Sequence, residues 1–340
     1  MSVAVIGAGA WGTALAAVLA SDGTTVSLHG RDAATLAAIH ETRENPRYLP
    51  GIALPALDAT TELDTALAGA ATVLLVVPVA ATAQTVRAMA PILAADATVV
   101  CCSKGLDPER EETPAAIVAR LVPNARVATL SGPSFAHDVA KGLPTAVTLG
   151  AAEMGEAGRL AALLSRPTFR LYAQDDLAGV ELGGALKNVM ALAVGTARGL
   201  RLGASAEAAV IARGFSELVR IAVALGARRD TLHGLSGLGD LVLSCASEQS
   251  RNFAYGVALG EGRSTEGLPL AEGVRTAATA ARISRREGLD CAIVEGMARL
   301  LAGEVEAKAL VEELLARPLR QEGDGAQPSW RKGSEPGAAS

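Results

Sequence analysis

The chain opens with a glycine-rich turn between a strand pattern and a helix pattern. Residues 3–20 read VAVI-GAGAWG-TALAAVLA. In this context Gly7 permits a tight turn, Gly9 lets backbone N–H groups approach a phosphate, and Gly12 lets the helix pack closely on the strand. The pattern predicts a βαβ unit that binds the pyrophosphate of a dinucleotide at the start of the helix. The alternative is a glycine turn with a purely structural role.

Short valine-rich runs alternate with helical patterns through the first half of the chain. Such runs, spaced by helix-length segments, predict a mainly parallel sheet covered on both faces, which is a Rossmann-type doubly wound α/β fold. The direction of the last runs is left open. The runs occupy residues 3–7, 24–30, 72–78, 97–103, 125–130, 145–150 and 168–172.

After Tyr172 the pattern changes to helical spacing with few β-branched runs, which predicts an all-α C-terminal domain. We expect a dinucleotide-binding domain over residues 1–174 and a helical catalytic domain over 175–318. The polar, Gly/Pro/Ser-rich tail 319–340 is expected to be disordered, and its Trp330 to have no anchoring role. The expected helices cover residues 176–197, 205–225, 237–245, 249–259, 271–287 and 291–301, with a last one before Pro318.

Composition narrows the class of protein further. Half of the 340 residues are hydrophobic but only 3% are aromatic, so small aliphatic side chains must form a closely packed core. The net charge of −5 gives no general attraction to nucleic acid or anionic membranes. The N-terminus lacks the positive segment of a signal peptide, so we expect a cytoplasmic protein. The uncharged stretch 65–86 fits helix end, strand and loop better than a membrane span.

The cysteines have neither CxxC spacing nor paired histidines. We therefore expect no metal site and no disulfide framework. His137 and His233 lie near the motifs below, and neither is assigned a catalytic role.

Lys187 is the most unusual residue of the helical part. It lies in ELGGALKNVMALA, where apolar neighbours cover almost every direction around the helix. A lysine in apolar surroundings has a lowered pKa and is a common general acid or base. The alternative is a lysine whose stem packs while its ammonium group reaches water.

Two basic residues follow predicted strands. Arg31, in HGRD at the end of the second strand, stands where an acid usually binds the adenosine ribose, and an arginine there accommodates a 2′-phosphate. This favours NADPH, with NADH as a second cofactor; the alternative is a solvated arginine paired with Asp32. Lys104, in SKGL directly after a strand, lies at the sheet edge where ligands bind. Its alternative is an ordinary loop lysine.

Three further motifs carry polar side chains. Ser134, in SGPSFA, is expected to cap a helix or to leave an anion site at the helix start. Asp240, in GLGDLVL, is either an acid at a helix start or the partner of a buried cation. Ser250, Arg251 and Asn252 bring together a hydroxyl, a guanidinium and an amide, which suits a phosphate dianion; a helix start with local salt bridges is the alternative.

Together these stretches closely resemble the bacterial NAD(P)-dependent glycerol-3-phosphate dehydrogenases. The resemblance runs in family order from the N-terminus to about residue 302, and its most specific part is GVELGGALKN followed by GLGDL and SRN. The other matching stretches are GAGAWGTALA, NPRYLPG, SKGL, SGPSFAHDVAKGLPTA, GLSGLGDLVLSC, SRNFAYG, AEGV and the Arg-Gly pair at 213–214.

The resemblance implies a cytoplasmic homodimer that interconverts dihydroxyacetone phosphate and sn-glycerol 3-phosphate for phospholipid synthesis. It implies that Lys187 is the catalytic acid and base, with Lys104 and Asp240 in the same catalytic group. The implied substrate contacts are Lys104, Gly132, Ser134, Lys187, Asp240, Ser250, Arg251 and Asn252. The implied cofactor contacts, besides the three glycines, are Ala10, Trp11, Arg31, Lys104, Ala136, Arg251 and Glu272.

The chain departs from the family pattern before Arg213. Ser205 stands where an asparagine is usual, and Glu207 where a basic residue is usual, which puts the local support of the site in doubt. Two other functions remain as alternatives. A β-hydroxyacid or 6-phosphogluconate type of dehydrogenase would oxidise a carboxylated substrate, and a non-catalytic dinucleotide sensor would bind NADPH without turnover.

Overall fold

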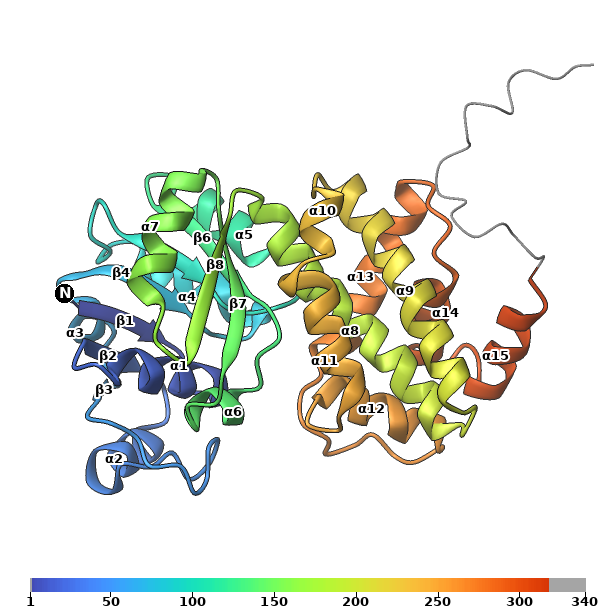
Figure 1. The fold of residues 1–340 in the computed structure, drawn as a ribbon, viewed down its shortest axis with the longest axis horizontal. Coiled ribbons are helices and arrows are strands. Elements are labelled where there is room, and N and C mark those ends of the chain that lie inside the picture. Colours follow the sequence, from blue (N-terminus) through green and yellow to red (C-terminus); the bar gives the residue numbers. More distant parts are fainter. Residues whose placement is uncertain (1, 318–340) are drawn as a thin grey trace, which may run out of the picture.

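The computed structural model describes residues 2–317, and within them a sheet of eight strands precedes a group of helices. The predicted tail 319–340, with Trp330, lies outside the described residues. Figure 1 shows the strands in one half of the molecule and the later helices in the other. The strands are β1 (Ser2–Ile6), β2 (Thr25–His29), β3 (Asp58–Thr60), β4 (Ala70–Leu75), β5 (Thr98–Cys101), β6 (Arg126–Ser131), β7 (Thr145–Ala151) and β8 (Phe169–Gln174).

The strand order is β3-β2-β1-β4-β5-β6-β7-β8. The pairs from β3 to β6 are parallel, β7 is antiparallel to β6, and β8 is again parallel to β7. The Rossmann-type prediction is confirmed, and the order reverses between β1 and β4, where such sheets bind ligands. The sequence patterns missed β3.

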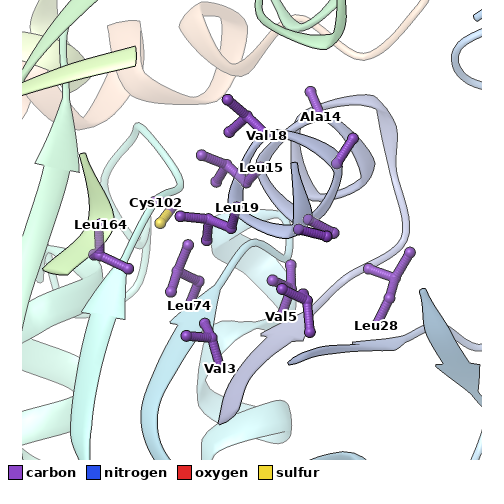
Figure 2. Close-up of a cluster of buried hydrophobic side chains, with 14 of the residues drawn as sticks. Val3, Val5, Ala14, Leu15, Val18, Leu19, Leu28, Leu74, Cys102 and Leu164 are labelled. Carbon is purple, nitrogen blue, oxygen red and sulfur yellow. The ribbon is translucent and has the colours of Figure 1, made fainter. Parts of the chain in front are cut away.

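Helices of the first half connect the strands. They are α1 (Ala10–Ala20), α2 (Ala33–Thr42), α3 (Leu63–Leu67), α4 (Val79–Met89), α5 (Pro114–Leu121), α6 (Ala136–Ala140) and α7 (Met154–Leu164). Figure 2 shows Leu15 and Leu19 of α1 packed beside Val5 of β1 and Leu74 of β4, all nearly inaccessible to solvent. This packing fixes the start of α1 over the carboxyl end of β1.

The second half is all-helical, as predicted. The predicted domain division after residue 174 stays a prediction; β8 ends at Gln174 and the next helix begins at Leu177. The helices are α8 (Leu177–Gly199), α9 (Ala204–Ala224), α10 (Arg229–Leu232), α11 (Asp240–Ala246), α12 (Arg251–Gly260), α13 (Glu272–Arg286), α14 (Ala292–Leu301) and α15 (Ala307–Leu315), with a π-helical turn at Leu235–Gly239.

Helix α8 is the centre of this half. By length and composition it is the one helix within residues 2–317 that could cross a membrane, but 89% of its most apolar window is buried inside the protein. It is therefore a core helix of the folded protein.

Helices α8 and α12 approach each other backbone to backbone. A Cβ atom on Gly195 would lie 2.2 Å from the carbonyl oxygen of Phe253, and one on Gly256 would lie 2.2 Å from that of Leu192. These distances are far below van der Waals contact, so only glycine fits at this crossing. The close approach holds the start of α12 against the helix that carries Lys187.

Candidate active site

Lys187 does not extend to solvent. Its side chain is 9% exposed, and its Nζ donates a hydrogen bond to Ser244 Oγ at 2.5 Å. The same Nζ lies 3.0 Å from Asp240 Oδ1. The lysine therefore faces a carboxylate and a hydroxyl of α11, although most of its sequence neighbours on α8 are apolar.

Asp240 lies between two lysines. Its second oxygen, Oδ2, is 2.5 Å from Nζ of Lys104, which follows β5, while Oδ1 faces Lys187. Asp240 is also the first residue of α11, directly after the π-helical turn. Both roles left open for it are realised: it is an acid at a helix start and the partner of buried cations.

Charge and burial act against each other in this group. Burial lowers the pKa of Lys187, and the Asp240 carboxylate only partly opposes this effect. Burial alone would raise the pKa of Asp240, but the charges of Lys104 and Lys187 outweigh burial and lower it. The carboxylate therefore stays ionised, while Lys187 gives up its proton more readily than a solvated lysine. Such a lysine is suited to donate and recover a proton at a substrate oxygen.

Gly132 and Ser134 lie beside Lys104. Lys104 Nζ donates to the carbonyl oxygen of Gly132 at 3.0 Å. Gly132 has a φ of 152°, and a Cβ there would lie 2.8 Å from Cα of Val147, so only glycine fits. The expectation that Ser134 caps a helix is wrong: α6 begins after Phe135 without a side-chain cap, and Ser134 Oγ instead donates to Gly132 O at 3.0 Å.

Asn252 is engaged by protein groups on both sides of its amide. Its Nδ2 donates to Asn188 Oδ1 at 3.0 Å, and its Oδ1 accepts from Gly273 N at 2.9 Å. These bonds join α12 to α8 and to the start of α13. The sequence patterns predicted no role for Asn188 or Ser244, whose partners Asn252 and Lys187 are distant in sequence.

Ser250 and Arg251 begin α12. Ser250 Oγ accepts from Phe253 N at 3.4 Å and so caps the helix. Arg251 is exposed and makes no hydrogen bond or ion pair with any residue of the described part. A free guanidinium at the positive end of a helix is suited to hold an anion. Burial raises the pKa of Glu272, the first residue of α13, although the charges of Arg275 and Arg251 lower it in part.

The residues of the glycine turn fit a dinucleotide. Gly7 has a φ of 123°, a Cβ on Gly12 would lie 1.8 Å from Gly7 O, and a Cβ on Gly9 would meet no atom within 4 Å. The first turn of α1 has no side-chain cap. The indole Nε1 of Trp11 is buried without a hydrogen-bond partner in residues 2–317. Open space, uncapped N–H groups and an orphan donor together match a pyrophosphate. Ala136, the first residue of α6, packs on the same core cluster as Ala10 and Trp11.

Asp32, the acid that follows β2 in the chain, is already bound by other protein groups. Asp32 caps α2 through Ala34 N and lies 2.8 Å from Nη1 of Arg47. Arg31 is exposed and has no ion pair with a described residue, so the alternative of an Arg31–Asp32 pair is not found. Asp32 is therefore engaged by other protein groups, whereas the Arg31 guanidinium is left for a 2′-phosphate.

No group of histidine, cysteine or acidic side chains in residues 2–317 could hold a metal ion. All the cysteines are free and buried.

The Rossmann-type sheet with its glycine turn, followed by helices that bury a lysine, is typical of a dehydrogenase that uses a nicotinamide dinucleotide. Comparison with known proteins gives the particular family. Residues 2–157 match the model of the NAD-dependent glycerol-3-phosphate dehydrogenase N-terminus, and residues 176–312 match that of the C-terminus. The chain belongs to this family, has its glycerol-3-phosphate dehydrogenase activity and uses NAD(P) as coenzyme.

The similarity to known relatives covers nearly the whole chain. A glycerol-3-phosphate dehydrogenase (NAD(P)+) of Mesorhizobium japonicum is 50% identical, covering 94% of this chain and 93% of its own. The Brucella canis relative of the same name is 48% identical, covering 94% and 98%. The crystal structure of glycerol-3-phosphate dehydrogenase from Coxiella burnetii has a TM-score of 0.88 at 36% identity, covering 93% of this chain and 99% of that one.

Glu207, which stands where the family usually has a basic residue, pairs with an arginine of the neighbouring helix. Glu207 forms a two-fold contact with the Arg198 guanidinium, with distances of 2.5 and 2.6 Å. Arg198 also lies 5.5 Å from the ring centre of Phe253 on α12. The acidic residue therefore joins α9 to α8 in this chain. Ser205 is exposed, and nothing in the structure explains this substitution.

Proposed function

We propose that this enzyme interconverts dihydroxyacetone phosphate and sn-glycerol 3-phosphate with Lys187 as general acid and base. The observation that carries the proposal is the buried Lys187 ammonium held by Asp240 and Ser244. Its product would supply phospholipid synthesis. In this proposal the enzyme works as a cytoplasmic homodimer, without nucleic acid and without stable membrane insertion.

The proposed mechanism divides the reaction between cofactor and protein. When bound, the nicotinamide supplies or takes up the hydride. Lys187 donates a proton to the carbonyl oxygen during reduction and removes it during oxidation. Asp240 orients Lys187 and keeps its protonated form populated, and the second cation, Lys104, polarises the substrate beside it. Ser250 and Asn252 are proposed to hold the phosphate of the substrate with Arg251, and Gly132 and Ser134 to contact the substrate beside Lys104. This binding positions the carbonyl.

Arg251 is proposed to bind the phosphate of the substrate. Arg251→Ala is expected to raise the KM for dihydroxyacetone phosphate by about 100-fold, because a charge-assisted contact worth roughly 3 kcal/mol is lost. Steady-state kinetics would measure this. Arg263→Ala, near the far end of the same helix, is the control and should keep a normal KM. A change confined to NADPH affinity would disprove the phosphate role.

The experiment that tests the whole proposal follows NADPH oxidation with dihydroxyacetone phosphate beside unphosphorylated dihydroxyacetone. Rapid oxidation with the phosphorylated ketone alone would support it. If neither ketone supports NADPH oxidation, but NADP+ is reduced with a carboxylated hydroxyacid, the β-hydroxyacid type of enzyme would be favoured. NADPH binding without turnover of either ketone would favour a dinucleotide sensor.

NADPH is proposed as the preferred cofactor because Arg31 is free while Asp32 is occupied. Arg31→Asp is expected to weaken NADPH binding about tenfold or more and to leave NADH binding nearly unchanged, since only NADPH carries the 2′-phosphate. Fluorescence titration of the protein with each cofactor measures this without turnover. The control is Arg87→Asp on α4. An unchanged ratio of the two dissociation constants would contradict the assignment.

A further inference from the structure

The segment between β5 and α5, residues 103–113, belongs to the first half of the chain but is held by the helical half. Leu106 is 2% exposed and lies in the same buried cluster as Leu182 and Leu186 of α8. Lys104, at the start of the segment, pairs with Asp240. The segment therefore reaches the catalytic group with its first residues and packs on the helical core with the next ones.

Glu111 fastens the far side of this segment to α13. Its Oε1 accepts a hydrogen bond from Arg282 Nε at 3.3 Å, and its Oε2 accepts from Arg286 Nη1. Arg282 also donates to the carbonyl oxygen of Pro108 at 2.5 Å. Glu111 has a φ of 59°, a left-handed conformation that costs a non-glycine residue free energy and persists where surrounding contacts over-determine it.

Glu181 holds the end of the segment where α5 begins. Its Oε1 accepts from Ala115 N at 2.9 Å, and its side chain is buried on α8. Burial raises the pKa of Glu181 to about 7. Both ends of the segment are thus attached to helices of the second half.

Residues 107–112 form a turn that is closed by its own hydrogen bonds. Glu111 N donates to Asp107 O, and Asp107 N donates to Glu112 O, both at 2.9 Å. Asp107 Oδ1 also accepts from Arg110 N at 2.9 Å. Because these bonds close residues 107–112 into one turn, we expect the loss of the Glu111 contacts to let this turn shift, and with it the residues that lead back to Lys104.

We propose that Glu111 is a positioning residue for the reaction, which acts by holding residues 103–113 on Arg282 and Arg286 so that Lys104 stays against Asp240. The inference rests on the proposed function of Lys104 at the substrate. Glu111 itself touches neither substrate nor cofactor in this scheme.

The first test is Glu111→Gln, which removes the charge and keeps the size of the side chain. It should lower kcat/KM for dihydroxyacetone phosphate about tenfold, because small misplacements of a catalytic group are costly. Glu111→Asp, which keeps the charge, should restore part of the loss. Glu112→Gln is the matched control: Glu112 is 20% exposed against 19% for Glu111, but it pairs with Arg110 and Arg120 of the first half of the chain and not with α13.

The second test asks whether Glu111 acts through Lys104. In a Lys104→Ala background, Glu111→Gln should lower kcat/KM no further, whereas a general weakening of the fold would add its own loss. Amide hydrogen exchange of residues 103–113 should be faster in Glu111→Gln than in Glu112→Gln.

The outcomes separate this inference from the proposed function. Normal kinetics of Glu111→Gln, or a second tenfold loss in the Lys104→Ala background, would overturn the positioning role and leave the role of Lys104 intact. A Lys104→Ala enzyme with normal kcat/KM would refute the role of Lys104 itself and the positioning with it.

Discussion

Replacing Lys187 with alanine is expected to lower the turnover number for dihydroxyacetone phosphate by about 1,000-fold, the size of effect that a positioned general acid supplies. NADPH should still bind, because the proposed cofactor contacts of the glycine turn lie on α1 and not on α8. Turnover would be followed by NADPH absorbance and binding by fluorescence. Near-normal turnover would refute the assignment.

Two controls separate the chemistry of Lys187 from its packing. Lys187→Met keeps much of the volume of the side chain and should be as inactive as Lys187→Ala if the lost proton is the cause. Lys141→Ala, at the end of α6, removes an exposed lysine and should leave turnover unchanged. If Lys187→Met recovered most of the activity, the lysine would matter for packing alone.

The pH dependence follows from the direction of the pKa. Burial lowers the pKa of Lys187, so the ammonium form is lost at a lower pH than in a solvated lysine. Reduction needs this form and should slow as pH rises through the lowered pKa, whereas oxidation needs the free amine and should accelerate. A reduction rate that is flat across this range would argue against Lys187 as the proton donor.

The sequence predicts the architecture well because its signals are local. The glycine turn, each valine-rich run and the apolar spacing of α8 are patterns whose residues lie within one short stretch of sequence. The missed strand β3 reads only DAT and lacks a β-branched run. The antiparallel direction of β7 depends on pairing with β6, which no local pattern encodes.

The side-chain partners of the site are not predictable in the same way. Lys104 and Asp240 meet across 136 positions of sequence, and Lys187 and Ser244 across 57. A motif can mark such residues as unusual, but only packing of α8, α11 and the β5 edge brings them into contact. Ser134 was predicted wrongly for a different reason. A serine just before a helix suggests a cap, but the N-cap position of α6 is one residue later, at Phe135.

The charge balance around Asp240 leads to the second large effect. Asp240→Asn would leave Lys104 and Lys187 facing each other without the anion that separates them. Removing one partner of a buried ion pair costs about 3 kcal/mol of folding stability because the remaining charge is uncompensated. Thermal or urea unfolding should therefore show a clear loss, which Asp138→Asn on α6 would not share.

Asp240→Asn should also change the pH dependence of the reduction rate, which a loss of folding stability alone would not do. The carboxylate raises the pKa of Lys187 against the effect of burial, so its loss lowers that pKa further. The alkaline limit of the reduction rate should then move to lower pH, and kcat/KM should fall about 100-fold near neutral pH, where less of the lysine is protonated and its orientation is lost.

The free energy of unfolding should also depend on pH through Asp240. The folded-state pKa of Asp240 lies below its ordinary value, so its contribution is present above the ordinary carboxylate pKa and disappears as pH falls through the lowered folded-state pKa. The difference in unfolding free energy between wild type and Asp240→Asn should therefore be largest near neutral pH and shrink in acid. A difference that is constant across this range, together with an unmoved pH limit of reduction, would mean that Asp240 is not the ionised partner of the two lysines.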